Sequence, residues 1–308
     1  MPAAFRIIRS VVVQPLLSAL NDAHSGVREA AAAALGGVPD ESLVRVLVGC
    51  LGDNSAQVRA AAAGALVRRG VPLPRTLLVA LNDPNPEMRR LAAEIICRIG
   101  PAAIADLTAA LHDDDWALRR SASEVLDRLR WTPPRDATGA AYWLARGDWD
   151  ACAAMGAGAV GPLREALRSA NPDHRRSATV ALGRLGSAAV EPLLADLADL
   201  SVEVRRSAAA ALRVIGPEAV APLTAALTGR GDRPVLAAEL LGEIGDRSAV
   251  APLVTALDAP EPELRKAAVA ALGRLGDPSA VPALVASLDS PTWGLPQAAA
   301  SALGAIGD

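Results

Sequence analysis

The chain repeats one sequence unit with a nearly constant period. A leucine closes each copy, and these leucines are Leu20, Leu51, Leu81, Leu111, Leu167, Leu197, Leu227, Leu257 and Leu288. Successive leucines lie 30 or 31 residues apart, except between Leu111 and Leu167, where the interval is 56 residues. A fixed period of this length is the signature of stacked structural repeats. The sequence therefore predicts nine copies of one unit with a single interruption.

Each unit has the pattern of two helices joined by a polar turn. In residues 190–215 we expect Pro192 to open the first helix, because the first helical N–H groups have no intrahelical partner. We number the second helix of every unit from position 0, which is Val204 in this copy. Apolar residues fall on one helical face at positions 0, 4, 8 and 11. They are Val204, Ala208, Leu212 and Ile215.

Helix ends are marked in most units. Ser201 stands three residues before position 0 and is expected to cap the second helix. The same place holds Ser55, Asn85, Asp115, Asn171 and Thr292. A glycine is expected to end the second helix in seven units. These glycines are Gly70, Gly100, Gly186, Gly216, Gly245, Gly276 and Gly307.

A helical pair this short cannot bury its own apolar face, whereas stacking identical pairs buries a continuous core. We therefore expect an all-α fold, an α-solenoid of nine two-helix repeats with one helical insert after the fourth. Residues 1–131 would hold four repeats, 132–159 the insert, and 160–308 five repeats, in one continuous solenoid. Only seven of the 308 residues are aromatic, so the core is expected to consist of Ala, Leu, Val and Ile.

Composition excludes several classes of protein. A formal net charge of -3 argues against a general nucleic-acid binder, which would be markedly basic. Cys50, Cys97 and Cys152 lie far apart, which argues against a disulfide framework or a zinc ribbon and favours a reducing cytoplasm. No stretch approaches the length of an apolar transmembrane helix, so membrane insertion is not expected.

Segments 190–216 and 250–277 carry V-x-P-L, a polar turn and a second helix of the type V-R-R-x-A-A-x-A-L. They resemble HEAT repeats of the phycobilisome-lyase type, and the resemblance covers nearly all of the chain outside 132–159. It implies a superhelical, armadillo-like helical fold whose second helices line the concave surface. Related segments are typical of prokaryotic proteins.

Position 1 of the second helix is an arginine in seven units, and the preceding turn often supplies an aspartate. The arginines are Arg28, Arg59, Arg89, Arg119, Arg175, Arg205 and Arg265, and the aspartates are Asp22, Asp53, Asp83, Asp113 and Asp199. The favoured interpretation is structural: Asp–Arg pairs between successive turns, with further bonds to free carbonyl groups. An anion-binding stripe is the alternative, although acidic neighbours weaken it.

Positions 2, 6 and 9 are expected to point away from the core and to form the surface of the concave groove. Much of this surface is Gly or Ala, which predicts a smooth groove. Its charged residues in units three to six form the candidate partner-binding set: Arg90, Glu94, Arg120, Glu124, Asp127, Arg176, Arg206 and Arg213. Two interpretations remain open, a solvated face with weak ion pairs and a mixed-charge groove for a partner protein.

The interruption contains most of the aromatic residues: Trp131, Tyr142, Trp143 and Trp149. It is expected to be an irregular helical hairpin. Its aromatic side chains would either fasten the two halves of the solenoid together or form an exposed binding or dimer contact, since exposed Trp and Tyr are common in interfaces.

No catalytic motif is apparent. His24, His112 and His174 occupy different places in their units, and the repeated His-Glu pairs of deoxyhypusine hydroxylase are absent. The sequence therefore favours a non-enzymatic scaffold or adaptor that needs no cofactor and binds a protein or peptide. The alternative is an enzyme or enzyme subunit related to phycobilin lyases or to that hydroxylase. Self-association through apolar surface of the last repeat, near Leu295 and Leu303, would compete with groove binding.

Overall fold

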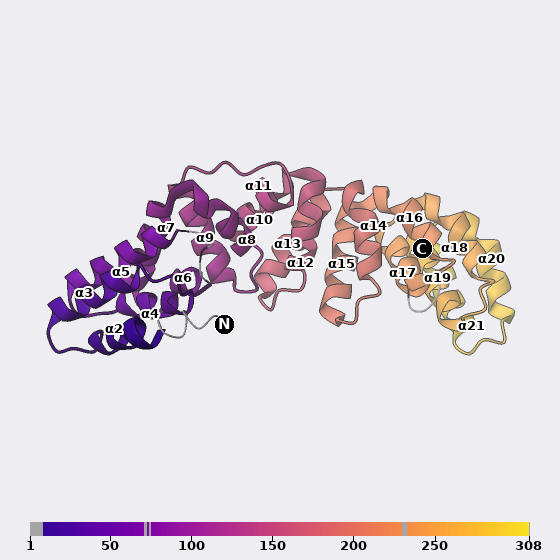
Figure 1. Cartoon of the computed structure of the whole chain (residues 1–308). Coiled ribbons are helices and arrows are strands. Elements are labelled where there is room, and N and C mark those ends of the chain that lie inside the picture. Colours follow the sequence, from indigo (N-terminus) through magenta and orange to yellow (C-terminus); the bar gives the residue numbers. More distant parts are fainter. Residues whose placement is uncertain (1–8, 71–72, 74, 230–232, 308) are drawn as a thin grey trace. The chain divides into compact units, whose positions relative to one another are not determined.

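The computed structural model describes residues 9–70, 73, 75–229 and 233–307. All regular elements in these ranges are helices, so the all-α prediction is confirmed for them. Figure 1 shows the helices stacked along the chain as antiparallel pairs, which is the arrangement of an α-solenoid.

The first half of the chain contains eight α-helices after a π-helical turn (Arg9–Val13), counted over the described residues. They are α2 (Gln14–Ala19), α3 (Ser25–Leu35), α4 (Ser42–Cys50), α5 (Ala56–Arg69), α6 (Arg75–Ala80), α7 (Pro86–Ile99), α8 (Ile104–Ala110) and α9 (Trp116–Arg128). The insert forms the short pair α10 (Ala137–Ala145) and α11 (Trp149–Ala153).

The second half continues the same alternation of first and second helices. Its helices are α12 (Val160–Ala166), α13 (Pro172–Arg184), α14 (Ser187–Asp196), α15 (Val202–Ile215), α16 (Val220–Ala226), α17 (Arg233–Ile244), α18 (Val250–Ala256), α19 (Pro262–Leu275), α20 (Val281–Ala286) and α21 (Leu295–Gly307). Short 3-10 turns lie at Gly100–Ala103, Gly156–Ala159, Gly216–Ala219, Arg247–Ala249, Pro278–Ala280 and Ser287–Asp289.

Contacts divide the chain into two compact units. The first unit consists of Met1–Pro134 and Ala145–Gly147, and the second consists of Arg135–Leu144 and Asp148–Asp308. Within the first unit the second helices α3, α5, α7 and α9 contact one another in succession. Within the second unit the same is true of α13, α15, α17, α19 and α21. In each unit the second helices therefore form one layer, and the first helices pack against it.

The core repeats two side chains from unit to unit. Position 4 of the second helix is alanine in every copy, and each of these alanines is at most 2% exposed. They are Ala31, Ala62, Ala92, Ala122, Ala178, Ala208, Ala237, Ala268 and Ala299. Position 8 is Leu or Ile and is buried from Leu35 to Leu272, whereas Leu303 in α21 is half-buried. Small residues at position 4 let the helices approach closely, which is why the core needs few aromatic side chains.

Position 9 does not belong to a smooth groove, contrary to the sequence-based expectation. A Cβ added to Gly242 of α17 would lie 2.7 Å from the Cα of Ala271 in α19, and one added to Gly273 would lie 2.9 Å from the Cα of Ala302. Such distances are shorter than carbon atoms tolerate. Glycine therefore stands at position 9 because the next second helix packs against it.

The spacing of second helices follows from this position. The pairs whose first member has a glycine there, such as α3–α5, α17–α19 and α19–α21, are in closer contact than α5–α7, α7–α9 and α15–α17. In the looser pairs position 9 is occupied by Val67, Cys97 and Arg213. A side chain at position 9 thus coincides with a more open seam between adjacent helices.

Most predicted helix ends are confirmed. The side chains of Asn85, Asp115, Asn171 and Ser201 each accept a hydrogen bond from a backbone N–H of the helix they precede. Ser55 makes no such bond. The Thr292 hydroxyl lies within hydrogen-bond distance of an Arg265 Nη2 donor, at 2.6 Å.

The predicted terminal glycines have positive φ, except for Gly307, which lies inside α21. The first helix of the 190–215 copy starts earlier than expected, because α14 begins at Ser187 and holds Pro192 inside it. Residues 187–190 form an extra helical turn before Pro192. The preference of proline for the first turn of a helix could not predict this extra turn.

Candidate interaction surface

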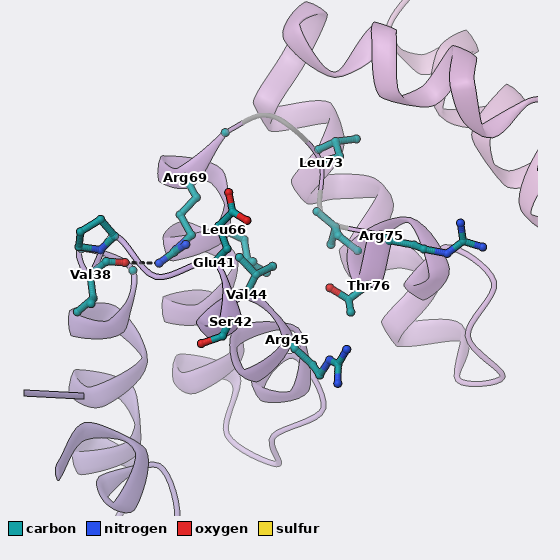
Figure 2. A pocket seen from close by; sticks show the side chains of 15 residues that line it. Val38, Glu41, Ser42, Val44, Arg45, Leu66, Arg69, Leu73, Arg75 and Thr76 are labelled. Atoms are coloured by element: carbon teal, nitrogen blue, oxygen red, sulfur yellow. Dashed lines mark hydrogen bonds between the residues drawn. The ribbon is translucent and has the colours of Figure 1, made fainter. Parts of the chain in front are cut away.

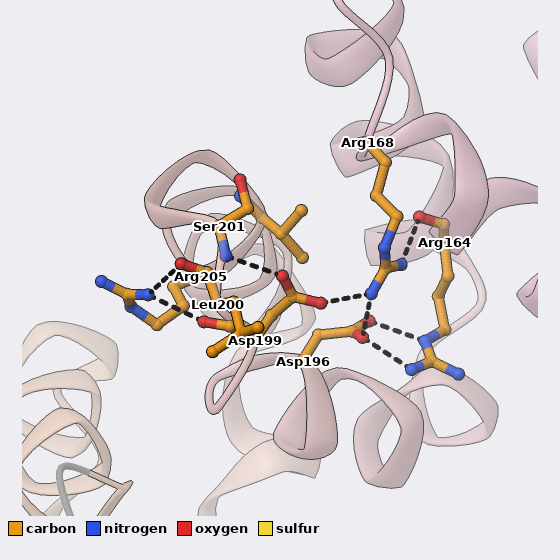
Figure 3. Close-up of polar contacts among 8 residues, drawn as sticks. Arg164, Arg168, Asp196, Asp199, Leu200, Ser201 and Arg205 are labelled. Atoms are coloured by element: carbon orange, nitrogen blue, oxygen red, sulfur yellow. Dashed lines mark hydrogen bonds and ion pairs between the residues drawn. The ribbon is translucent and has the colours of Figure 1, made fainter.

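The position-1 arginines bind the turn of their own helical pair. Arg205 Nη1 donates to the carbonyl oxygens of Asp199 at 2.7 Å and Leu200 at 3.1 Å (Figure 3). Arg59, Arg89, Arg175 and Arg265 make the same two bonds to the residues five and six positions earlier. These guanidinium groups donate to turn carbonyls that accept no hydrogen bond within a helix. The geometry therefore favours a structural role for these arginines.

The predicted ladder of Asp–Arg pairs is largely wrong. Only Arg28, among the described position-1 arginines, binds the aspartate of the next turn, through a two-pronged contact with Asp53 at 2.8 and 2.9 Å. The turn aspartates instead accept from a backbone N–H two residues later, as Asp199 does from Ser201 at 2.9 Å. That backbone bond is the main cause of the lowered pKa of Asp199.

The predicted surface residues of the first unit lie on α7 and α9 and are paired. Arg90 binds Glu87 at 2.8 Å and Glu94 at 2.9 Å, and its pKa is raised mainly by the bond to Glu87. Arg120 binds Glu124 at 3.2 Å, so both predicted i,i+4 pairs form. Asp127 has a partner that local spacing could not predict, Arg146 in the turn between α10 and α11 of the insert.

The predicted surface residues of the second unit lie on α13 and α15 and are also paired. Arg176 binds Asp173 at 3.2 Å and Arg206 binds Glu203 at 3.3 Å, both within one helical turn. Arg213 reaches across to Glu243 on α17 at 3.0 Å. The arginines of the predicted set in both units are thus balanced by carboxylates, which gives this set a mixed charge.

A small pocket of about 250 Å³ opens between α7 and α9, within the predicted surface of the first unit. Arg90 and Glu124, two of the predicted residues, line it together with Ala93. Sequence reasoning missed two further lining residues, Ser121 and Arg128. Comparison of neighbouring repeats could have found Arg128, since Arg68 and Arg98 occupy the same position in the preceding units.

The profile of one known family matches most of this chain. The family is described as HEAT repeats, and the matched segments are residues 13–81, 73–154, 160–239 and 234–304. The chain belongs to the HEAT-repeat family. A comparison with curated proteins finds no match.

Several solved structures resemble the HEAT-repeat chain at low similarity. An engineered protein is 21% identical, with a TM-score of 0.36 over 96% of this chain and 99% of the other. Human deoxyhypusine hydroxylase in complex with glycerol is 20% identical, with a TM-score of 0.30 over 99% of both chains. Kap121p is 14% identical, with a TM-score of 0.36 over 96% of this chain and 37% of its own. At these values the similarities assign no function to this chain.

A larger pocket in the first HEAT unit was not foreseen. It has a volume of about 920 Å³ and lies between the end of α5, the α3–α4 loop and the start of α6 (Figure 2). Apolar side chains such as Val44 and Leu77 line it, and Arg69 crosses it to donate to the carbonyls of Val38 and Asp40. The pocket depends on the connections between repeats, whose shape the periodic pattern does not predict.

A buried carboxylate ties two HEAT repeats of the second unit together. Asp196 is 2% exposed and accepts two bonds from Arg164 on α12, both at 2.6 Å (Figure 3). Arg168 lies 3.4 Å from the same carboxylate and also binds Asp199. The sequence carried a signal for this network: in seven of the other units a small apolar or thiol residue precedes the marker leucine, and here an aspartate does.

The aromatic side chains of the insert are largely packed. Tyr142 is buried, while Trp131, Trp143 and Trp149 are half-buried. Tyr142 and Trp143 meet edge to face at 5.0 Å, and Trp149 packs beside His174 at 5.9 Å between ring centroids. This degree of burial disfavours a freely exposed aromatic patch at the insert. Whether these rings fasten the two halves of the solenoid stays a prediction.

The ionisable side chains of the described residues bear on metal binding and on nucleophilic chemistry. No cluster of three or more His, Cys, Asp or Glu able to hold a metal ion occurs among the described residues. Burial raises the pKa of the Cys152 thiol to about 12, which removes its nucleophilic form near neutral pH. In the described part of the chain, every helix is too short or too polar to span a bilayer.

Proposed function

We propose that this HEAT-repeat protein is a non-catalytic scaffold that binds another protein or peptide on the exposed surface of its second helices. One observation carries the proposal: buried positions are uniform along the chain, whereas exposed positions of the same helices are not. Position 4 is alanine throughout, yet position 2 changes from Glu29 to Ala60 to Arg90. Folding requires the first pattern but leaves the second free for a partner to specify.

The chemistry of the surface favours a protein partner. The arginines of the candidate partner-binding set are paired with carboxylates, so this set presents alternating charges, which suit the mixed groups of a protein surface. We also propose that the repeats are of the phycobilisome-lyase type. A location in the reducing cytoplasm is a further part of the proposal, and the three free thiols support it.

The proposal is tested by reversing one surface pair. In the variant Arg120→Glu with Glu124→Arg, the ion pair can still form, so the fold is retained while the field presented to a partner changes sign. A partner captured from native lysate should bind this variant at least several-fold more weakly. Reversal of Arg247 and Asp277, a pair at 3.8 Å between the 3-10 turn Arg247–Ala249 and the residue that precedes the turn Pro278–Ala280, is the control. Equal affinity for both variants and the wild type would contradict the proposal.

Self-association through the last helical pair is the competing mode of interaction. Val285 and Leu288 of this pair are exposed, whereas Leu295 is 2% exposed and belongs to the core rather than to the terminal surface. Val285→Asp is therefore the clean probe, and Leu295 is not. If partner binding survives the Arg120 and Glu124 reversal but is lost in a folded Val285→Asp protein, the terminal surface is the binding site.

The non-catalytic part of the proposal has its own test. Purified protein should contain no iron and should transfer no bilin to an acceptor protein. Stoichiometric iron, or transfer of a bilin, would replace the scaffold by an enzyme.

A further inference from the structure

Three arginines form a line across the second helices of the first unit. Arg68 on α5, Arg98 on α7 and Arg128 on α9 all occupy position 10 and are exposed; we call them the arginine row. Among the described residues, none of the three is paired with a carboxylate. The equivalent Arg184 in the second unit differs, because it binds Asp150. A favourable interaction with the helix C-terminus explains one arginine per helix but not the missing counter-charges.

The arginine row lies over the seams between helices. Arg68 Nη2 donates to the carbonyl of Ala33 on the preceding second helix α3, at 3.4 Å. Burial raises the pKa of the Cys97 thiol on α7, and the positive charge of Arg128 on α9 partly opposes this rise. Two members of the row thus lean toward the second helix before their own. Arg128 also lines the pocket between α7 and α9.

The seam beneath Arg128 contains a subsite for an anionic group. The pocket of about 250 Å³ between α7 and α9 is lined by Arg128 and by Ser121. The Ser121 hydroxyl makes no hydrogen bond within the described structure. Beside this seam α7 has Cys97 at position 9, where tightly packed helices have glycine. Glu124 also lines this pocket, but its carboxylate is paired with Arg120. The guanidinium of Arg128 and the unbonded hydroxyl of Ser121 are donors suited to a carboxylate.

The spacing of the row indicates the shape of its ligand. Adjacent packed helices lie about 10 Å apart. A polyproline II segment has three residues per turn and rises about 3.1 Å per residue, so every third side chain falls on one face about 9 Å from the last. We propose that the arginine row binds an acidic peptide in this conformation, with a carboxylate at every third residue and one of them in the α7–α9 pocket. The inference rests on the proposed function and names the partner's chemistry.

Carboxylates on the same surface favour a peptide over a nucleic acid. Glu94 lies four residues before Arg98 on α7, and Glu124 and Asp127 lie four residues and one residue before Arg128 on α9. A polynucleotide has a phosphate at every residue and would bring some of them against these carboxylates. A peptide with acidic side chains only at every third residue avoids this repulsion, because its intervening residues are uncharged.

The probe is a fluorescein-labelled peptide of three Pro-Pro-Glu triplets, measured by fluorescence anisotropy on the full chain at low salt. Arg98→Gln and Arg128→Gln should each weaken binding by about two- to fivefold, the effect of losing one exposed ion pair. Arg45→Gln is the matched control, since Arg45 is exposed on the first helix α4 and lacks a carboxylate partner among the described residues. A peptide of the same composition with its three Glu contiguous should bind more weakly.

Several results would overturn the inference. They are no binding of the triplet peptide, an equal effect of Arg45→Gln, equal binding of the contiguous peptide, or tighter binding of an oligothymidylate that needs the same arginines. The proposed function can be judged separately with the native partner. A partner that is sensitive to the Arg120 and Glu124 reversal but indifferent to Arg98→Gln and Arg128→Gln would remove the arginine row and leave the scaffold function standing.

Discussion

Gly242 of α17 packs against Ala271 of α19 so closely that a side chain on the glycine would collide with the Ala271 backbone. The distance from an added Cβ to the Ala271 Cα would be 2.7 Å. Position 9 of the second helix therefore decides how tightly one repeat packs on the next. Where it is glycine the helices close together, and where it is Cys97 a pocket lies beside the seam.

This contact leads to a prediction about Gly242→Ala. The variant should lose about 1–3 kcal/mol of unfolding free energy, because an extra methyl group in a packed interface forces the helices apart. Gly304→Ala is the matched control, since Gly304 occupies the same position in α21 and an added Cβ would meet no atom within 4 Å. It should be neutral or stabilising by up to about 1 kcal/mol. Urea unfolding of both variants decides; equal stability would refute the packing role of position 9.

The position-1 arginines should act on stability and not on binding. Arg205→Ala leaves two turn carbonyls without their donor and should cost about 1–3 kcal/mol. Its neighbour Arg206 is exposed and makes one i,i+3 pair, so Arg206→Ala should cost less than about 0.5 kcal/mol. Thermal melting compares the two. An unchanged melting temperature for Arg205→Ala together with lost partner binding would show that this arginine is a ligand contact.

The buried Asp196 network should be strongly coupled. Asp196→Asn leaves the guanidinium of Arg164 without its charged acceptor and should destabilise the protein by about 2 kcal/mol. Replacing both residues, Asp196→Leu with Arg164→Leu, should recover much of this loss, since neither partner is then left unpaired. A double-mutant cycle that adds the single variants Asp196→Leu and Arg164→Leu, measured by urea unfolding, gives the coupling energy. Additive effects of the two single changes would show that the pair contributes nothing of its own.

Acid should weaken the first unit through Asp53. The bond from Arg28 is the main cause that lowers the pKa of Asp53 below the usual value for aspartate. A carboxyl group whose pKa is lower in the folded state stabilises the fold above its unfolded pKa of about 4, and the contribution disappears as the pH falls through the folded pKa. Asp53→Asn should therefore be destabilising at pH 7 and close to wild type near pH 2.

The control for this pH dependence is Asp114→Asn, because Asp114 is exposed in the α8–α9 turn and has no bonded partner within the described residues. It should change stability little at either pH. A destabilisation by Asp53→Asn that is as large at pH 2 as at pH 7 would attribute the effect to packing and not to the ionised carboxylate.

The periodic part of the structure could be predicted from the sequence because it depends on buried residues that recur. Positions 4 and 8 of the second helix, which are Ala208 and Leu212 in α15, define the core of every copy. The helices, most caps and most terminal glycines follow from the same pattern. The count of nine repeats stays a prediction. The predicted ladder of Asp–Arg pairs was largely wrong because backbone groups of the same turn satisfy these side chains. Asp199 accepts a hydrogen bond from the N–H of Ser201, and Arg205 donates to the carbonyl oxygen of Asp199.

Contacts between repeats were the harder part. The local pairs Arg90–Glu94 and Arg120–Glu124 follow from i,i+4 spacing. The Arg213–Glu243 pair joins residues 30 positions apart, and a single sequence gives no register for it. The role of position 9 was missed for the same reason. Glycine there looked like open surface on one helix, and only the neighbouring helix shows it to be a contact.

Site-specific photo-crosslinking of a native partner tests the central claim most directly. A benzophenone amino acid would replace Ala60 on the exposed face of α5, and separately Arg45 on the first helix α4 of the same repeat. The account predicts that the partner is cross-linked from position 60 and not from position 45. Cross-links from position 45 with none from position 60, in protein that remains folded, would contradict binding on the surface of the second helices.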